Sequence, residues 1–180
     1  DAAAVVVPPP KSLSVALVTD GNYYLERAIA SLNLQKPQQI TPAEYEQKIP
    51  DADVIIFDRY SPRQLPAGGN FIYFGAIAPG LRVTAERVAD APAMIEDIGV
   101  LDWRRDHPIV RHLQLGRVYA ASMLKLNVPP DVVSLVDGLK GPMVVLHREG
   151  RGTHLIVAFD VMQSNWPLRT SFPVFLHQAL

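Results

Sequence analysis

The sequence of 180 residues contains no cysteine. This absence excludes disulfide bonds, thiolate nucleophiles, and zinc or iron–sulfur sites held by thiolates. The sequence also has almost no net charge, because 17 Lys and Arg oppose 18 Asp and Glu. Non-specific nucleic-acid binding needs a broad basic surface, so we expect no nucleic-acid partner. Long hydrophobic runs are missing as well. The apolar stretch at residues 2–7 is too short for a bilayer span and has no basic flank, so it predicts neither a transmembrane helix nor a signal peptide.

What remains is typical of a globular domain, with 48% hydrophobic residues and enough length to bury a sizeable core. Residues 1–11 include three consecutive prolines and are predicted to form an extended linker. Residues 12–180 are predicted to form a single domain. A helical pattern of apolar residues continues to Leu180 without a terminating signal. We therefore expect the chain to be a fragment of a longer polypeptide.

The first half alternates predicted strands with predicted helices. Residues 13–19, 53–58 and 70–75 are apolar runs of the kind found in strands buried on both faces of a parallel sheet. Between the first two, Leu25, Ala28, Ile29 and Leu32 form a helical stripe. This alternation predicts an α/β fold of the flavodoxin or Rossmann-like class, with a mostly parallel sheet flanked by helices.

The second half is predicted to be rich in antiparallel strands, at residues 95–101, 118–126, 132–136, 143–147 and 154–159. If Gly150 and Arg151 form a two-residue turn, Val144 lies opposite Val157, Leu146 opposite Leu155, and His147 opposite His154. Both faces of this hairpin are apolar, so we expect it in the interior of the sheet.

Two groups of polar residues follow predicted parallel strands. Asp20, Gly21 and Asn22 follow the first strand, and Asp58 and Arg59 follow the strand at 53–58. Ligands of open α/β sheets bind at the carboxyl ends of the strands, so these five residues are the candidate ligand-binding site. The alternative is a turn followed by a helix cap, which the same residue types favour.

A second candidate site is the triplet His147-Arg148-Glu149. Strand alternation places His147 and Glu149 on one face, as a base and the carboxylate that orients it. The alternative is a strand that runs into a charged hairpin tip. His147 and His154 could also form a cross-strand metal pair, but the sequence supplies no third or fourth ligand, so no metal is expected.

Two clusters combine an aromatic side chain with arginine. Residues 103–107 hold Trp103 with Arg104 and Arg105, which suit contact with a partner or an anion, or a solvated loop. Residues 166–169 hold Trp166, which we expect to pack in the core, and Arg169, which we expect to pair with a carboxylate near the start of the last helix.

Taken together in order, several segments resemble the C-terminal domain of bacterial BatA-type membrane proteins that carry a von Willebrand factor A domain. The segments are residues 18–22 (VTDGN), 25–28 (LERA), 53–59 (DVIIFDR), 65–70 (LPAGGN), 106–112 (DHPIVRH), the hairpin at 150–152, and 159–160 with 165–173 (NWPLRTSFP). In that family the domain is similar to class I glutamine amidotransferases.

The resemblance implies a membrane-anchored parent protein, with this domain on the extracytoplasmic or periplasmic side and membrane contact only through the parent. It implies the neighbouring von Willebrand A domain, or another envelope protein, as partner, and a MoxR-type AAA ATPase system acting through the parent. Amidotransferases carry a catalytic cysteine at an elbow after a strand, and the position nearest to it here is Ile77. His147 and Glu149 resemble the partner pair of that cysteine.

These observations lead to three hypotheses. The first is a non-catalytic binding or structural module without a cofactor, because Ile77 cannot attack a carbonyl. The second is a small-molecule sensor that uses the strand ends at Asp20, Asn22, Asp58 and Arg59. The third is a divergent hydrolase with a serine or aspartate nucleophile beside His147.

Overall fold

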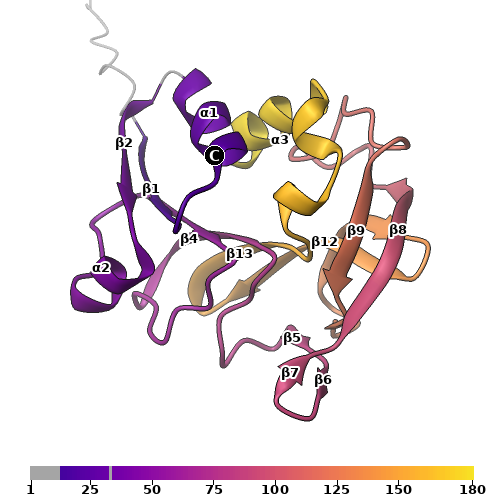
Figure 1. Cartoon of the computed structure of the whole chain (residues 1–180), viewed down its shortest axis with the longest axis horizontal. Helices are drawn as coiled ribbons and strands as arrows, with labels where there is room; N and C mark the ends of the chain where they lie inside the picture. The colour runs from indigo at the N-terminus through magenta and orange to yellow at the C-terminus, as the bar shows by residue number, and fades with distance from the viewer. Residues whose placement is uncertain (1–12, 33) are drawn as a thin grey trace, which may run out of the picture.

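In the computed structural model, which describes residues 13–32 and 34–180, one mixed sheet of nine strands forms the centre of the molecule (Figure 1). The strand order is β2-β1-β3-β4-β13-β12-β11-β8-β9. The parallel half comprises β1 (Ser14–Val18), β2 (Gln35–Ile40), β3 (Val54–Asp58), β4 (Gly68–Phe74) and β13 (Arg151–Val157). The predicted linker at residues 1–11 lies outside the described residues.

The other half of the sheet is antiparallel. It comprises β12 (Gly141–Glu149), β11 (Val133–Gly138), β8 (Met94–Trp103) and β9 (Tyr119–Leu124). The predicted hairpin register is confirmed, since Val144 pairs with Val157, Leu146 with Leu155 and His147 with His154. The hairpin is also interior, as expected, between β4 and β11. The expectation of a mostly parallel sheet was only partly right, because four of the nine strands run antiparallel to their neighbours.

The helices are short, and α1 and α2 each begin at a side-chain cap. Helix α1 (Tyr23–Ser31) is capped by the side chain of Asn22, which accepts a hydrogen bond from the backbone N–H of Leu25. Helix α2 (Pro42–Gln47) begins with a capping box between Thr41 and Glu44. Helix α3 (Ser171–Ala179) follows two short 3-10 helices, η1 (Val161–Gln163) and η2 (Trp166–Leu168). No helix in the described part of the chain is long and apolar enough to cross a membrane.

The helices divide between the two sides of the sheet. In Figure 1, α1 and α3 lie side by side above the sheet and α2 lies below it, and α1 and α3 are in contact. Trp166 is fully buried between Phe159 and the α3 residues Phe172 and Phe175, as predicted for this tryptophan. On the opposite face, Phe57 stacks on Tyr73 and meets Tyr45 of α2 edge to face. Aromatic packing therefore fills both layers of the core.

The segment between β4 and β8 differs from the expectation. It contains three two-residue strands that the sequence pattern did not reveal: β5 (Thr84–Ala85), β6 (Arg87–Val88) and β7 (Ala91–Pro92). Strand β5 pairs with the short strand β10 (Leu126–Asn127). Strands of this length leave no hydrophobic periodicity to detect, because two residues cannot display an alternation.

Both edges of the main sheet are protected. The edge strand β2 contains Pro37, which has no backbone N–H, and its pairing with β1 is interrupted by a bulge. At the other edge, the chain after β13 covers β9. The N–H of Leu124 donates to Ala158, the N–H of Asn165 donates to Tyr119, and Ala120 forms an isolated bridge with Ser164.

Candidate functional site

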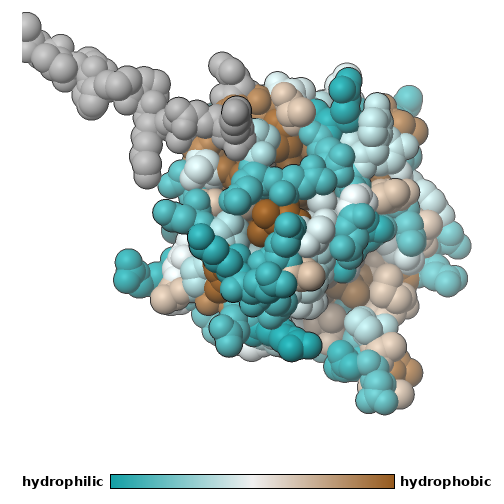
Figure 2. All heavy atoms as spheres, turned by 60° about the vertical axis from the view of Figure 1, so that its left-hand side comes forward, coloured by the Kyte–Doolittle hydropathy of each residue, from teal (hydrophilic) through white to brown (hydrophobic). Residues whose placement is uncertain are grey.

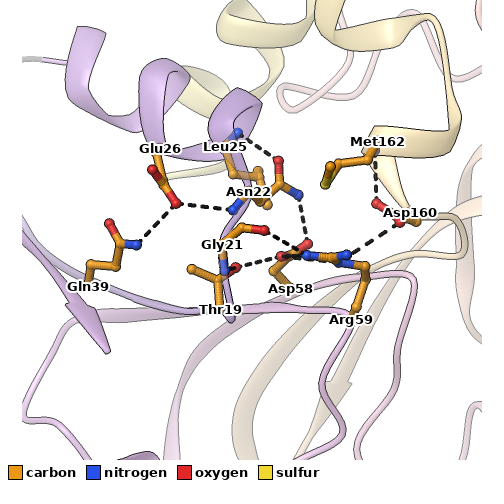
Figure 3. A network of polar contacts seen from close by, with 10 residues as sticks. All are labelled: Thr19, Gly21, Asn22, Leu25, Glu26, Gln39, Asp58, Arg59, Asp160 and Met162. Carbon is orange, nitrogen blue, oxygen red and sulfur yellow. Dashed lines mark hydrogen bonds and ion pairs between the residues drawn. The ribbon is translucent and has the colours of Figure 1, made fainter. Parts of the chain in front are cut away.

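Asp58 is the centre of a polar network at the carboxyl ends of the parallel strands (Figure 3). Its side chain is fully excluded from solvent. The carboxylate accepts hydrogen bonds from the Thr19 hydroxyl at 2.7 Å, the Asn22 amide at 2.8 Å, and the guanidinium of Arg59. Because β1 and β3 are adjacent and parallel, the residues that follow them meet at one edge of the sheet, as the sequence predicted.

Arg59 joins this network in an unusual backbone conformation. Its φ is +53°, in the left-handed region that side chains other than glycine rarely adopt. The conformation is held from several directions, because the backbone N–H donates to Phe74 and the guanidinium donates to the Gly21 carbonyl at 2.8 Å. The hydrogen bond to Asp58 raises the pKa of Arg59 above its ordinary value. Arg59 therefore stays positively charged, and hydrogen bonds to Gly21 and Asp58 hold its guanidinium at the strand ends.

Asp160 approaches the same network from the end of β13. Its carboxylate lies 3.9 Å from Nε of Arg59, and it caps η1 by accepting a hydrogen bond from the N–H of Met162. Burial raises the pKa of Asp160, against the opposing effects of that hydrogen bond and of Arg59. Gly75, at the end of β4, fits beside it with a φ of +64°; a Cβ there would lie 3.0 Å from the backbone nitrogen of Asp160.

The structure brings together four of the five predicted strand-end residues. Asn22 and Arg59 each donate hydrogen bonds to Asp58, and Gly21 contributes its carbonyl to Arg59 and its N–H to the Thr19 hydroxyl. Asp20 is exposed, and it acts on Arg59 only through its charge. Asn22 caps α1 as well, so the cap interpretation and the cluster interpretation describe the same side chain.

Sequence reasoning missed Thr19 and Asp160 as members of the network. A signal existed for Asp160, because it follows a strand as Asp58 does. Thr19 was the last residue of the predicted strand at 13–19, so it was interpreted as part of the apolar run and the role of its hydroxyl was missed. The network uses both oxygens of Asp58 internally, and Thr19 and Asn22 are buried. The network therefore links the ends of β1 and β3 by hydrogen bonds within the protein.

The second candidate pair also forms. Nε2 of His147 lies 3.1 Å from a carboxylate oxygen of Glu149, on the same face of β12, as strand alternation predicted. Burial opposes the charge on Glu149, but hydrogen bonds from the Arg82 backbone N–H and from His147 outweigh it, so its pKa lies below the usual value. Within the described chain, no serine or aspartate side chain is hydrogen bonded to His147.

His154 lies opposite His147 and extends the polar groups into the core. Its Nδ1 is 3.0 Å from the Tyr73 hydroxyl, and its ring stacks on Phe71. Burial, followed by the neighbouring His147, lowers the pKa of His154 to about 4. Across residues 13–32 and 34–180, no three His, Asp or Glu side chains converge in the way that a metal ion would need.

The register places the His147–Glu149 pair away from the elbow of the amidotransferase fold. His147 pairs with His154, which pairs with Phe71, three residues before the end of β4. Three strand residues span about 10 Å. The elbow follows β4 at residues 75–77, where Gly75, Ala76 and Ile77 carry no nucleophilic group. Ile77 is partly buried and packs against the core.

Comparisons with known proteins support the fold. No family model matches the sequence, and no curated protein does either. Among solved structures, a cytoplasmic protein of Salmonella typhimurium matches with a TM-score of 0.70 and 9% identity, over 92% of this chain and 96% of that one. A protein described as ThuA-like from Parabacteroides merdae matches with a TM-score of 0.62 and 13% identity, over 94% and 88%.

A protein described as a GMP synthase component, from Thermoplasma acidophilum, matches with a TM-score of 0.58 and 10% identity, over 93% of this chain and 92% of that chain. At such identities a likeness carries information about the fold alone. The ThuA-like and GMP synthase proteins have the glutamine amidotransferase-like fold. The chain therefore has an amidotransferase-like α/β fold, with an antiparallel second half to its sheet.

Proposed function

We propose that this domain is a non-catalytic, amidotransferase-like module that binds or scaffolds within a larger protein. The observation that carries the proposal is the strand register. It leaves an elbow without a nucleophile at one end of β4, and the His147–Glu149 pair toward the other end. Acyl transfer requires the nucleophile and its base within hydrogen-bond reach. The closed network around Asp58 supports the same conclusion, because it occupies the edge at which relatives of this fold bind ligands.

A binding role is also supported by exposed apolar side chains around α3. Tyr23 of α1, Met162 of η1, Leu168 of η2 and Val174 of α3 have exposed fractions of 66%, 46%, 76% and 43%. These elements contact one another in the chain α1, α3, η2, η1. By contrast, the β2 side of the molecule, turned forward in Figure 2, is mostly hydrophilic with small hydrophobic patches between.

The more specific form of the proposal comes from the sequence resemblance. In it, the parent is a membrane-anchored von Willebrand A protein, the domain is extracytoplasmic, and the partner is the neighbouring von Willebrand A domain. The test is to mix this domain with the separately purified adjacent domain of the parent and to measure association by calorimetry. We expect binding that Tyr23→Ser or Val174→Ser weakens and that Val88→Ser, an exposed valine on β6, leaves unchanged. Absence of association, or equal weakening by Val88→Ser, would refute this form of the proposal.

The non-catalytic character has its own test. We expect no release of ammonia from glutamine by the wild-type chain. We also expect none from Ile77→Cys, because restoring the thiol does not move His147 to the elbow. Glutamine hydrolysis by either protein that His147→Ala abolishes would contradict the proposal.

A further inference from the structure

A cavity of about 780 Å³ lies between the end of β8, the turn before β9 and the start of α3, apart from the Asp58 network. Its polar lining comprises Trp103, Gln114, Arg117, Arg169, Thr170 and Ser171. No acidic side chain is among the described residues that line it. The cavity therefore takes Trp103 from one aromatic–arginine cluster and Arg169 from the other, 66 residues apart in sequence, and Arg117 adds a second cation to its wall.

The two arginines of this wall have no carboxylate partner. Sequence reasoning expected Arg169 to pair with a carboxylate near the start of α3, and this expectation was wrong. In the described part of the chain, neither Arg169 nor Arg117 forms an ion pair. Nε of Arg169 is buried and has no hydrogen-bond acceptor among the residues that the structure describes. Leaving a buried N–H of a charged group without an acceptor costs free energy, so an acceptor that reached Nε of Arg169 would stabilise the protein.

Trp103 adds a second donor in the same state. Its indole Nε1 is buried and has no hydrogen-bond partner among the described residues. The guanidinium of Arg105 lies over the ring, 4.0 Å from its centroid, and is held by an ion pair with Asp102. Indole nitrogen is a donor only, so nothing but an acceptor can satisfy it.

The start of α3 completes the wall. Thr170 precedes the helix without capping it through its side chain, and no acidic residue lies in the first turn. The Ser171 hydroxyl accepts a hydrogen bond from Trp166, so its own proton remains available to donate. Pro173 has no backbone N–H, and the N–H of Phe172 donates to the carbonyl of Arg169. The start of α3 therefore contributes mainly the positive end of the helix dipole, and few free N–H groups.

We propose that this cavity binds a phosphate group carried by a small soluble molecule. Two guanidinium groups and two hydroxyls line one volume beside the ring of Trp103, and a tetrahedral oxyanion has enough acceptor oxygens to satisfy donors from several directions. A planar carboxylate offers only two acceptor oxygens, both in one plane, and so matches donors from several directions less well. The volume exceeds what an inorganic phosphate needs, which leaves room for the group that carries it. This proposal does not rest on the proposed non-catalytic role: the two share Leu168, which lines the cavity and is exposed near α3, but they are tested with different variants.

The experiment is a calorimetric titration of the 180-residue chain with inorganic phosphate, glycerol 3-phosphate and acetate, with ionic strength held constant by chloride. We expect both phosphates to bind and acetate to bind more weakly. Arg169→Gln and Arg117→Gln should each weaken phosphate binding roughly tenfold to a hundredfold, the range expected for hydrogen bonds to charged groups. Arg63→Gln removes a positive charge beside α2, and should leave the affinity unchanged.

Two further variants guard against loss of the fold. Arg169→Lys keeps the charge but loses the planar fork, so its affinity should fall between those of the wild type and Arg169→Gln. Trp103→Phe keeps an aromatic ring on the cavity wall and removes the orphan donor, so it should still unfold cooperatively in urea while binding phosphate several-fold more weakly. The proposal is overturned if neither phosphate binds the wild type, if Arg63→Gln weakens binding as much as Arg169→Gln, or if the chain binds only vesicles that contain phosphatidic acid.

Discussion

The Thr19 hydroxyl donates a 2.7 Å hydrogen bond to the carboxylate of Asp58, and this contact ties the ends of two adjacent strands 39 residues apart in sequence. The first prediction follows from it. Asp58→Ala leaves the hydroxyl proton of Thr19 and the amide N–H of Asn22 buried without their acceptor, and it removes the nearer of the two carboxylates beside Arg59. Since Arg59 is partly exposed to water, the loss should be about 2–4 kcal/mol, below the cost of breaking a fully buried pair. Urea unfolding measures it.

Two further variants separate the contribution of the Thr19 hydroxyl from that of the other groups around Asp58. Thr19→Val removes two hydrogen bonds, the one donated to Asp58 and the one accepted from the Gly21 N–H, and should cost about 2 kcal/mol. Thr84→Val, at an exposed threonine in β5, should change the free energy of unfolding by less than about 0.5 kcal/mol. An Asp58→Ala protein as stable as the wild type would show that the network does not fasten the strands.

The second prediction concerns pH. The pKa of His154 is lowered to about 4 in the folded chain, mainly by burial, whereas an unfolded histidine titrates near its ordinary pKa of 6.5. Between these values the unfolded state binds the proton and the folded state does not. Stability is therefore full above about pH 6.5 and is lost as the pH falls toward 4, by up to roughly 3 kcal/mol.

Urea unfolding at about pH 7 and about pH 4.5, on either side of the unfolded pKa, tests this dependence. His154→Leu should flatten the difference between the two conditions, because the group that takes up the proton is gone. His112→Asn is the control, since His112 is exposed and its φ of +65° suits asparagine. If His154→Leu retains the full pH dependence, the proton is taken up elsewhere.

The third prediction concerns the elbow after β4. Gly75 has a positive φ, and a Cβ at this position would press against the backbone of Asp160 at 3.0 Å. Gly80 also has a positive φ, of +82°, but nothing lies within 4 Å of its Cβ position. Gly80→Ala should therefore cost about 1 kcal/mol for the backbone alone, and Gly75→Ala about 2–3 kcal/mol because packing adds to it. Thermal and urea unfolding of both variants compare the costs. If both variants lose the same free energy of unfolding, the backbone of Asp160 shifts to accommodate the added Cβ and packing adds no cost.

The elements that the sequence predicted correctly are those with long hydrophobic patterns. The buried runs at β1, β3 and β4, the stripe of α1 and the β12–β13 hairpin each carry many apolar residues, so the periodicity was readable. The short strands β5, β6 and β7 were not, because local turns and tertiary pairing determine them. Boundaries also moved: β8 runs to Trp103, two residues beyond its predicted end.

The part of the candidate site that could be predicted was the part that follows from the parallel direction of neighbouring strands. Residues after adjacent parallel strands must meet, so Asn22, Asp58 and Arg59 were correctly grouped. The strand order that adds Asp160 depends on β13 joining β4, which is a contact between distant segments. The same limit explains Arg169. Its position beside a helix start suggested a carboxylate partner, but the turn at residues 114–117 brings a second arginine to it instead.

The protected edges of the sheet determine how this domain can meet other molecules. A bulge and a proline interrupt one edge and the chain after β13 covers part of the other, so within the described residues neither edge offers a long, regular row of backbone groups onto which a neighbouring copy could add a strand. Both features disfavour association by strand addition. We therefore expect association through side chains, as on the helical face, where specificity can be altered one residue at a time without disturbing the sheet beneath.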